Sequence, residues 1–177
     1  MVIYLVRHAR PAGADGMCYG RRDIPVAEEE TRSVVRSVRA LLPRDAMAEA
    51  SVQSSPLSRC AALAHELVPT RAAVMTPELL ELDFGSWEGR AWEDVPRVEL
   101  DAWARDPWAY APGGGESARS AFERFQRWAL RLRDEGHDTV VAVTHAGVIR
   151  LAMAAGSKDP SGLSLSIPYG SVHRVLL

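Results

Sequence analysis

The chain has 177 residues, of which 47% are apolar and 25% charged, a globular composition that excludes intrinsic disorder. The formal net charge of -2 argues against a general nucleic-acid or membrane-surface binder, because both need excess positive charge. No stretch approaches the roughly 20 apolar residues of a membrane span, and no signal peptide precedes Arg7. Cys18 and Cys60 form no CxxC pair, so we expect a reduced, cytoplasmic protein without a disulfide.

The chain opens with a predicted buried strand at 2–6, "VIYLV", which is apolar and β-branched throughout. A loop at 10–26 follows and holds five glycines and prolines. Loops of that length in a compact domain usually carry function. A helix is expected from Glu28 to Leu42, because valines and leucines recur there at helical spacing and Pro43 ends the pattern.

The remaining predicted elements, in chain order, are a strand at 52–55, a helix at 56–68, a strand at 72–75, an irregular segment at 79–89, helices at 92–105 and 116–135 separated by a flexible segment at 112–117, a strand at 139–144, a helix at 148–155 and a closing strand at 171–177. Strands that alternate with helices indicate an α/β fold, a three-layer α/β/α sandwich with a mostly parallel central sheet. No boundary divides the chain, so we expect a single domain over 1–177.

Two predicted strands end in the same way. The first runs into Arg7 and His8, and the strand that ends at Thr144 runs into His145 and Ala146. Ligands of open parallel sheets bind at the carboxyl ends of the strands, so both histidines face one crevice if their strands are neighbours. The segment after His145 is expected to begin a helix, whose free backbone N–H groups favour anions.

Four motifs in order then identify a family. "LVRHA" resembles the Leu-x-Arg-His-Gly opening of the histidine phosphatase (phosphoglycerate mutase-like) superfamily, and "VTHAG" its second histidine motif. "SSPLSRC" resembles its Ser-x-Leu-x-Arg helix start, and "ELDFGSWEG" its Glu-x-x-Phe/Tyr-Gly motif. The segments "DFGSWEG", "PGGGES" and "CYGRRDIPV" are most similar to the alpha-ribazole phosphatase branch of late cobalamin assembly.

The resemblance implies a role for each matching residue. His8 is the expected nucleophile, since imidazole is partly deprotonated near neutral pH and its nitrogen can attack phosphorus. Arg7, Arg59 and His145 are the expected remaining members of the phosphate pocket, where fixed cations stabilise the equatorial oxygens. No metal or organic cofactor is implied, and Arg7 beside His8 would repel a metal ion. Taken alone, His8 could instead be a structural histidine at a strand end, with its ring nitrogens hydrogen-bonded within the fold.

Glu81 is the expected general acid, because it matches the glutamate of the family motif and a leaving alkoxide needs a proton. Asp83, two residues further on, is the rival for that role. Glu88 is expected to have a structural role, such as pairing with a nearby arginine. The alternative for Glu81 is a surface acid at a helix edge.

Contacts to the leaving group are less well marked in the sequence. The candidates for substrate binding on that side are Arg10, Tyr19, Arg21 and Trp87. Ala146 is the candidate for binding the phosphate. The tryptophans at 92, 103, 108 and 128 are expected in the core or an interface. Ala9 departs from the family, which has glycine there, and an alanine with φ > 0 would cost stability.

The sequence therefore predicts a phosphomonoesterase that acts through phosphohistidine on a small-molecule phosphate ester, with alpha-ribazole 5′-phosphate suggested by resemblance. Two alternatives stay open: a phosphoglycerate mutase, which the short C-terminus disfavours, and a non-catalytic phospho-ligand binding module. We expect no nucleic-acid or membrane partner, and a monomer or homodimer.

Overall fold

The computed structural model describes residues 1–154 and 164–177, apart from the side chains of residues 45, 46 and 49. In that part of the chain, five strands form one sheet in the order β3-β2-β4-β1-β5. The strands are β1 (Val2–Arg7), β2 (Ser51–Ser54), β3 (Val74–Met75), β4 (Thr139–Thr144) and β5 (Val172–Leu176). All neighbouring pairs are parallel except β1 and β5. The sheet is therefore mostly parallel, as predicted.

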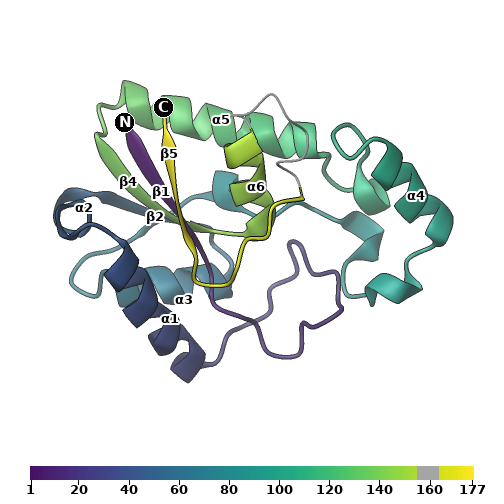
Figure 1. Ribbon diagram of the computed structural model, residues 1–177, viewed down its shortest axis with the longest axis horizontal. Coiled ribbons are helices and arrows are strands. Elements are labelled where there is room, and N and C mark those ends of the chain that lie inside the picture. Colours follow the sequence, from purple (N-terminus) through teal and green to yellow (C-terminus); the bar gives the residue numbers. More distant parts are fainter. Residues whose placement is uncertain (155–163) are drawn as a thin grey trace.

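Helices cover both faces of this sheet (Figure 1). They are α1 (Glu28–Leu41), α2 (Arg44–Glu49), α3 (Ser58–Leu67), α4 (Arg97–Arg105), α5 (Ala118–Asp134) and α6 (Ala146–Ala154), with 3-10 turns η1 (Pro77–Leu79), η2 (Gly85–Trp87), η3 (Trp92–Asp94) and η4 (Pro112–Gly114). Figure 1 shows α5 and α6 on one side of the sheet and α1 and α3 on the other, which confirms the three-layer prediction. No helix in the described residues combines the length and apolarity needed to cross a membrane.

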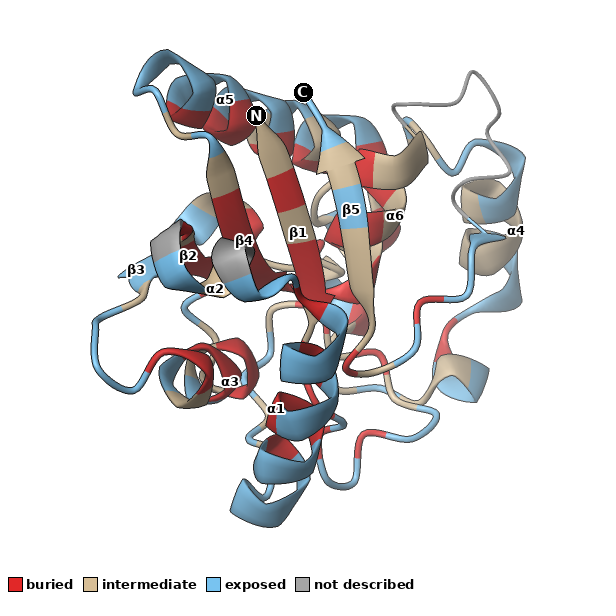
Figure 2. Cartoon of the chain, turned by 60° about the vertical axis from the view of Figure 1, so that its left-hand side comes forward, coloured by how far each residue is buried: buried red, intermediate tan, exposed pale blue. Residues whose placement is uncertain are grey.

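The alternation of side chains along each strand explains the two buried layers. Ile3 and Leu5 of β1 share a core cluster with Trp128 of α5, whereas Val6 shares another with Val38 of α1. Successive side chains of a strand point to opposite faces, so one continuous apolar run supplies both cores. Figure 2 shows the buried residues that follow β1 and β4 through the middle of the sheet.

The predicted helix at 92–105 is wrong in its first half. The structure has the short turn η3 there, and α4 begins only at Arg97, directly after Pro96. Proline donates no backbone hydrogen bond, and it disfavours the helical conformation in the residue before it. A helix can therefore start behind Pro96 but cannot run through it.

The helix predicted at 116–135 begins two residues later than expected. Ser117 is the N-cap of α5, and its hydroxyl accepts a hydrogen bond from the amide of Ser120 at 3.2 Å. Glu116 therefore lies before the helix and not in its first turn, which leaves its carboxylate free for other partners.

Two other helices differ from prediction. The short helix α2 (Arg44–Glu49) was not expected, since Pro43 was interpreted only as a stop. Helix α6 begins at Ala146, two residues before the predicted start, while its predicted end at Ala155 lies outside the described residues.

The segment at 112–117 was expected to be flexible, and this is wrong. It forms η4 and packs backbone against backbone on η2, with the amide of Glu116 donating to the carbonyl of Asp83 at 2.8 Å. A Cβ atom at Gly85, where φ is +52°, would overlap the carbonyl of Gly113. Glycine is required there because no other residue permits this close approach.

Candidate active site

The two predicted histidines meet at the carboxyl edge of the sheet. Strands β1 and β4 are parallel neighbours, with Arg7 opposite Thr144, so the next residue of each strand is a histidine. The ring centroids of His8 and His145 lie 5.0 Å apart at an interplanar angle of 63°. The juxtaposition expected from the two strand ends is therefore present.

A cavity of about 310 Å3 opens at this edge. Its walls are formed by Arg7, His8, Ala14, Asp15, Gly16, Met17, Tyr19, Gly20, Glu81, Phe84, Trp92, Ala146, Arg150 and Tyr169. Five of the ten predicted site residues are among them. The structure thus brings Arg7, His8, Tyr19, Glu81 and Ala146 around one space, and it places the other five outside the wall: Arg10, Arg21, Arg59, Trp87 and His145.

The protonation of His8 follows from its surroundings. Nδ1 lies 2.6 Å from the carbonyl oxygen of Ala9, which can only accept, so Nδ1 carries the proton. Burial, together with the nearby Arg59 and Arg7, lowers the pKa of His8 from 6.5 to about 3, against the opposing effect of the Ala9 hydrogen bond. The ring is therefore neutral near pH 7, and Nε2 holds a free electron pair.

His145 differs in its contacts. Its Nε2 lies 2.8 Å from the hydroxyl of Ser55 and 3.4 Å from the thiol sulfur of Cys60, and the ring is fully buried. Burial, with the nearby His8 and Arg59, holds the pKa of His145 well below 6.5. The low pKa favours a neutral His145 in the site without ligand, and its share of the positive charge beside a phosphate stays a prediction.

Two arginines, the half-buried Arg7 and the buried Arg59, supply the positive charge. The guanidinium of Arg7 donates to the carbonyl of Ile167 and stacks 3.6 Å above the ring centroid of Tyr169. That of Arg59 donates to the carbonyls of Gly20 and Arg22 at 2.6 and 2.8 Å. The Nε–H groups of both arginines are buried and have no partner among the described residues. Orphaned buried donors of this kind call for an acceptor such as an anion.

The carboxylate of Glu81 is held at the cavity wall by backbone amides. Its Oε2 accepts from Gly147 of α6 and its Oε1 from Leu82, both at 3.0 Å. A Cβ atom at position 147 would overlap Oε1, so a glycine lets the acid approach the start of α6. Asp83, the rival acid, accepts from the amide of Gly85 at 2.8 Å and lies outside the cavity wall.

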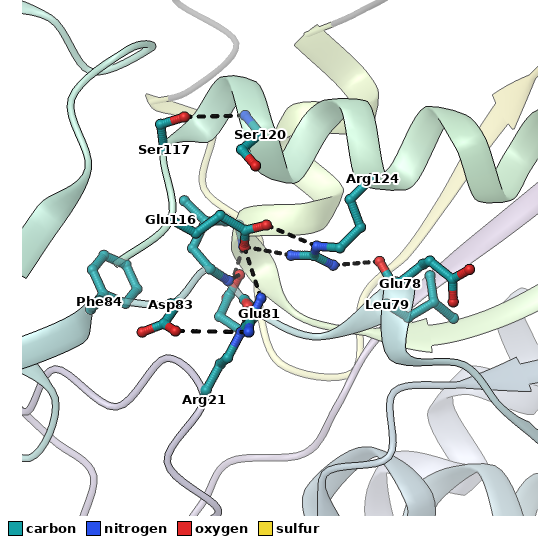
Figure 3. Close-up of polar contacts among 12 residues, drawn as sticks. Arg21, Glu78, Leu79, Glu81, Asp83, Phe84, Glu116, Ser117, Ser120 and Arg124 are labelled. Carbon is teal, nitrogen blue, oxygen red and sulfur yellow. Dashed lines mark hydrogen bonds and ion pairs between the residues drawn. The ribbon is translucent and has the colours of Figure 1, made fainter. Parts of the chain in front are cut away.

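A polar network behind Glu81 fixes the segment that carries it (Figure 3). Arg124 of α5 binds both carboxylate oxygens of Glu116, at 2.8 and 3.0 Å, and the carbonyl of Glu78. Arg21 binds Glu116 at 3.2 Å and Asp83 at 3.8 Å. Arg21 is therefore a partner of these acids, and its predicted contact with substrate is not present in this arrangement.

Two further candidates for the leaving-group side do not line the cavity. Arg10 is exposed and pairs at 2.6 Å with Asp15, which is a wall residue. Trp87 is fully buried and donates to Glu99 at 2.6 Å within an aromatic cluster. Tyr19 does line the cavity, with its hydroxyl 3.0 Å from that of Tyr169.

Glu88 and Ala9 both have structural positions. Glu88 is structural, as expected, but it accepts from the backbone amides of Arg21, Arg22 and Phe84, with no arginine side chain involved. Ala9 is buried, and no non-glycine residue among those described has positive φ. The alanine that replaces the family's glycine therefore fits without backbone strain.

Sequence reasoning missed three residues at the site. Ser55 belongs to the quoted "SSPLSRC" motif, so its contact with His145 could have been inferred from that motif. Arg150 lies one helical turn after Ala146, and a helix that starts at a strand end turns both toward the same cavity. Tyr169 carries no local signal, because only the return of the chain to β5 brings it to Arg7. No group of three or more His, Cys, Asp or Glu residues in the described part of the chain could hold a metal ion.

Comparisons with known proteins agree with this geometry. The family model described as "Histidine phosphatase superfamily (branch 1)" matches residues 3–176. An adenosylcobalamin/alpha-ribazole phosphatase from Escherichia coli (strain K12) is 28% identical over 162 residues, which are 87% of this chain and 78% of that protein.

Solved structures of the same shape cover nearly the whole chain. An alpha-ribazole phosphatase from Shigella flexneri matches with a TM-score of 0.81 and 25% identity, over 98% of this chain and 89% of that one. A phosphoglycerate mutase from Thermus thermophilus matches with a TM-score of 0.74 and 32% identity, over 99% of this chain and 92% of that one.

Proposed function

This chain belongs to the histidine phosphatase superfamily, and on that premise we propose that it hydrolyses phosphate monoesters through a phosphohistidine on His8. One observation carries the proposal. Nδ1 of His8 donates its proton in a hydrogen bond to the Ala9 carbonyl, so Nε2 is unprotonated. The ring that carries this free Nε2 lines the cavity. A neutral imidazole held in one tautomer is a competent nucleophile at neutral pH.

In the first step, Nε2 of His8 forms a bond to phosphorus as the bond between phosphorus and the ester oxygen breaks. Glu81, in its protonated form, gives its proton to that oxygen, and the alcohol leaves. In the second step, water attacks the phosphohistidine while the Glu81 carboxylate takes a proton from the water. Inorganic phosphate leaves, and both residues return to their starting states.

The charge of the transferred group is stabilised by Arg7 and Arg59, whose unpartnered Nε–H groups are donors without an acceptor in the described structure. Ser55 already accepts from the amide of Leu57, at 3.4 Å, so its hydroxyl proton is free for Nε2 of His145. In that arrangement Nδ1 of His145 carries a proton and can donate to a phosphoryl oxygen. His145 then contributes a hydrogen bond, while the arginines contribute charge.

The substrate class in this proposal is a small phosphate ester in the cytoplasm. Alpha-ribazole 5′-phosphate is the first candidate, because the Escherichia coli and Shigella flexneri relatives are alpha-ribazole phosphatases. With that substrate, the protein would act in cobalamin assembly. The Thermus thermophilus relative makes phosphoglycerate mutase the second candidate. A phosphatase panel containing the ribazole ester, beside a coupled assay from 3- to 2-phosphoglycerate, separates the two.

The general acid provides the sharpest test of the mechanism. We expect Glu81→Gln to lower kcat/KM for an alkyl phosphate by about 10²- to 10⁴-fold, because the alkoxide then leaves without a proton. The loss should be much smaller for p-nitrophenyl phosphate, whose leaving group needs no proton. Asp83→Asn is the matched control and should show no dependence on the leaving group. Equal losses for both esters in Glu81→Gln would remove Glu81 from this role.

A binding module without catalysis makes a different prediction. It would be stabilised by phosphate in a thermal shift measurement, yet rapid quench after mixing with an aryl phosphate would trap no acid-labile phosphoenzyme. We expect both the shift and the phosphoenzyme in the wild-type protein.

A further inference from the structure

A second, smaller cavity adjoins the phosphate cavity on the side of Glu81. It has a volume of about 190 Å3 and shares three wall residues with the first cavity: Glu81, Phe84 and Arg150. The two spaces are therefore neighbours across the residue proposed to protonate the leaving oxygen. Whatever is attached to that oxygen starts at the boundary between them.

The chemistry of the wall changes at this boundary. Beyond Glu81 and Arg150 the second cavity is lined mainly by Leu82, Trp103, Pro107, Ala118 and Leu151. Its walls come from α4, from the first residue of α5 and from α6, so three helices of the fold enclose it. An apolar wall offers no partner to a phosphate or a sugar hydroxyl, but it favours an apolar group by removing it from water.

The boundary itself is polar. Arg150 donates from Nε to the carbonyl of Leu165 at 2.7 Å, and Glu81 is held by the amides of Gly147 and Leu82. Both side chains are thus held in place by backbone groups, and both line the two cavities. From the first cavity to the second, the walls therefore match a phosphate, then a short linker with polar atoms, and then an apolar group.

The volume limits the size of that apolar group. A cavity of about 150 Å3 lined by apolar side chains binds benzene. The second cavity, at about 190 Å3, has room for one ring with a small substituent. Two of its wall residues are aromatic: the rings of Phe84 and Trp103 lie at 81° to each other with centroids 6.0 Å apart.

From this arrangement we infer that the second cavity is a leaving-group subsite, and that the protein prefers phosphate esters of alcohols that carry an apolar ring a few bonds from the ester oxygen. The inference rests on the proposed function, since it takes Glu81 as the residue nearest the leaving oxygen. It adds a substrate class that the residues of the phosphate cavity do not specify.

The test compares 2-phenylethyl phosphate with ethyl phosphate, because their leaving alcohols have similar reactivity and differ in the ring. Burial of one ring should raise kcat/KM by about 10- to 100-fold for the phenylethyl ester in the wild-type protein. Ala118→Leu fills the cavity and should reduce that preference about tenfold. Ala129→Leu, an equally buried alanine further along α5 in another core cluster, is the control and should keep the preference.

Overpacking can also unfold a variant, so a cavity-enlarging substitution complements the first. Leu151→Ala should shift the preference from the phenylethyl ester toward 2-(2-naphthyl)ethyl phosphate. Equal kcat/KM values for the phenylethyl and ethyl esters in the wild-type protein would overturn the subsite. So would a preference that neither Ala118→Leu nor Leu151→Ala changes.

Binding of phosphonates separates this inference from the proposed function. Calorimetry with 2-phenylethylphosphonate and ethylphosphonate, which cannot be hydrolysed, should show about tenfold tighter binding of the first, and Ala118→Leu should abolish the difference. If the ring strengthens binding but no ester is hydrolysed, the subsite stands and the phosphatase proposal fails. If esters are hydrolysed but the ring adds no affinity, the subsite is wrong.

Discussion

The ends of β1 and β4 are nearly the same in sequence and yet differ in what they present to the cavity. Each places a histidine one residue beyond the paired Arg7 and Thr144. His8 lines the cavity and bonds only its Nδ1 to the backbone, whereas His145 is fully covered and bonds its Nε2 to Ser55. In the proposed mechanism, these equivalent positions on neighbouring strands therefore take different roles, an attacking group at His8 and a supporting group at His145.

The difference comes from the segment after each strand. β1 leads into a long loop that runs to α1 (Figure 1), and the ring of His8 at its start lines the cavity. β4 leads at once into α6, while the loop before α3 brings Ser55, and α3 itself brings Cys60, against His145. The continuation of the chain, more than the strand end itself, decides which histidine lines the cavity.

The largest effect should come from His8→Asn. The asparagine amide can keep the hydrogen bond to the Ala9 carbonyl, but it cannot attack phosphorus, so activity should fall by at least about 10⁴-fold. Steady-state kinetics and rapid quench check this, and no acid-labile phosphoenzyme should form. Retention of more than about one per cent of the activity would contradict the nucleophile assignment.

The matching substitution at the end of β4, His145→Asn, should lower the activity less than His8→Asn does. His145→Asn removes a hydrogen bond to the transferred group, and loss of one such donor costs about 10²- to 10³-fold in kcat. Phosphoenzyme should still accumulate on His8, only more slowly. If His145→Asn abolished the phosphoenzyme while His8→Asn retained it, the roles of the two strand ends would be reversed.

A smaller effect is expected when only the support of His145 is removed. Ser55→Ala leaves Nε2 without its partner at 2.8 Å, so kcat should fall about tenfold and the free energy of unfolding by about 1 kcal/mol. Ser54→Ala is the matched control, since its buried hydroxyl bonds to the carbonyl of Ser55 at 2.9 Å. That variant should lose similar stability and keep its kcat. Equal kcat values in the two variants would mean that Ser55 does not orient His145.

The last prediction concerns the pH dependence of stability, which leaves the activity near pH 7 unchanged. The pKa of His8 is about 3 in the folded state and 6.5 when unfolded, so the unfolded chain binds the extra proton between these values. The free energy of unfolding should therefore rise with pH from about 3 to 6.5, by at most about 1.4 kcal/mol per pH unit from this group, and stay level above. Denaturant unfolding at several pH values measures it, and His8→Asn should have a shallower slope. Parallel slopes would show that His8 is protonated in the folded protein.

The local sequence determined the frame of the site. The alternation of strands and helices predicts a parallel sheet. Two of its apolar strands end in Arg-His and Thr-His, which predicts that both histidines lie at one edge. The structure confirms this because parallel neighbouring strands end at the same edge. Arg7, His8, Glu81, Tyr19 and Ala146 could be placed at the cavity from motifs alone, since each adjoins a strand end, a helix start or a loop that leads there.

Contacts between distant segments were decided only by the tertiary structure. Arg21 is 95 residues from Glu116, and Tyr169 is 150 residues from Tyr19, so no local pattern predicts either pair. The neutral state of His145 and the apolar cavity beside Glu81 depend likewise on burial by several helices. Residue types in a motif specify which chemistry is possible. Desolvation and long-range packing decide which group is charged, which is covered and which meets the substrate.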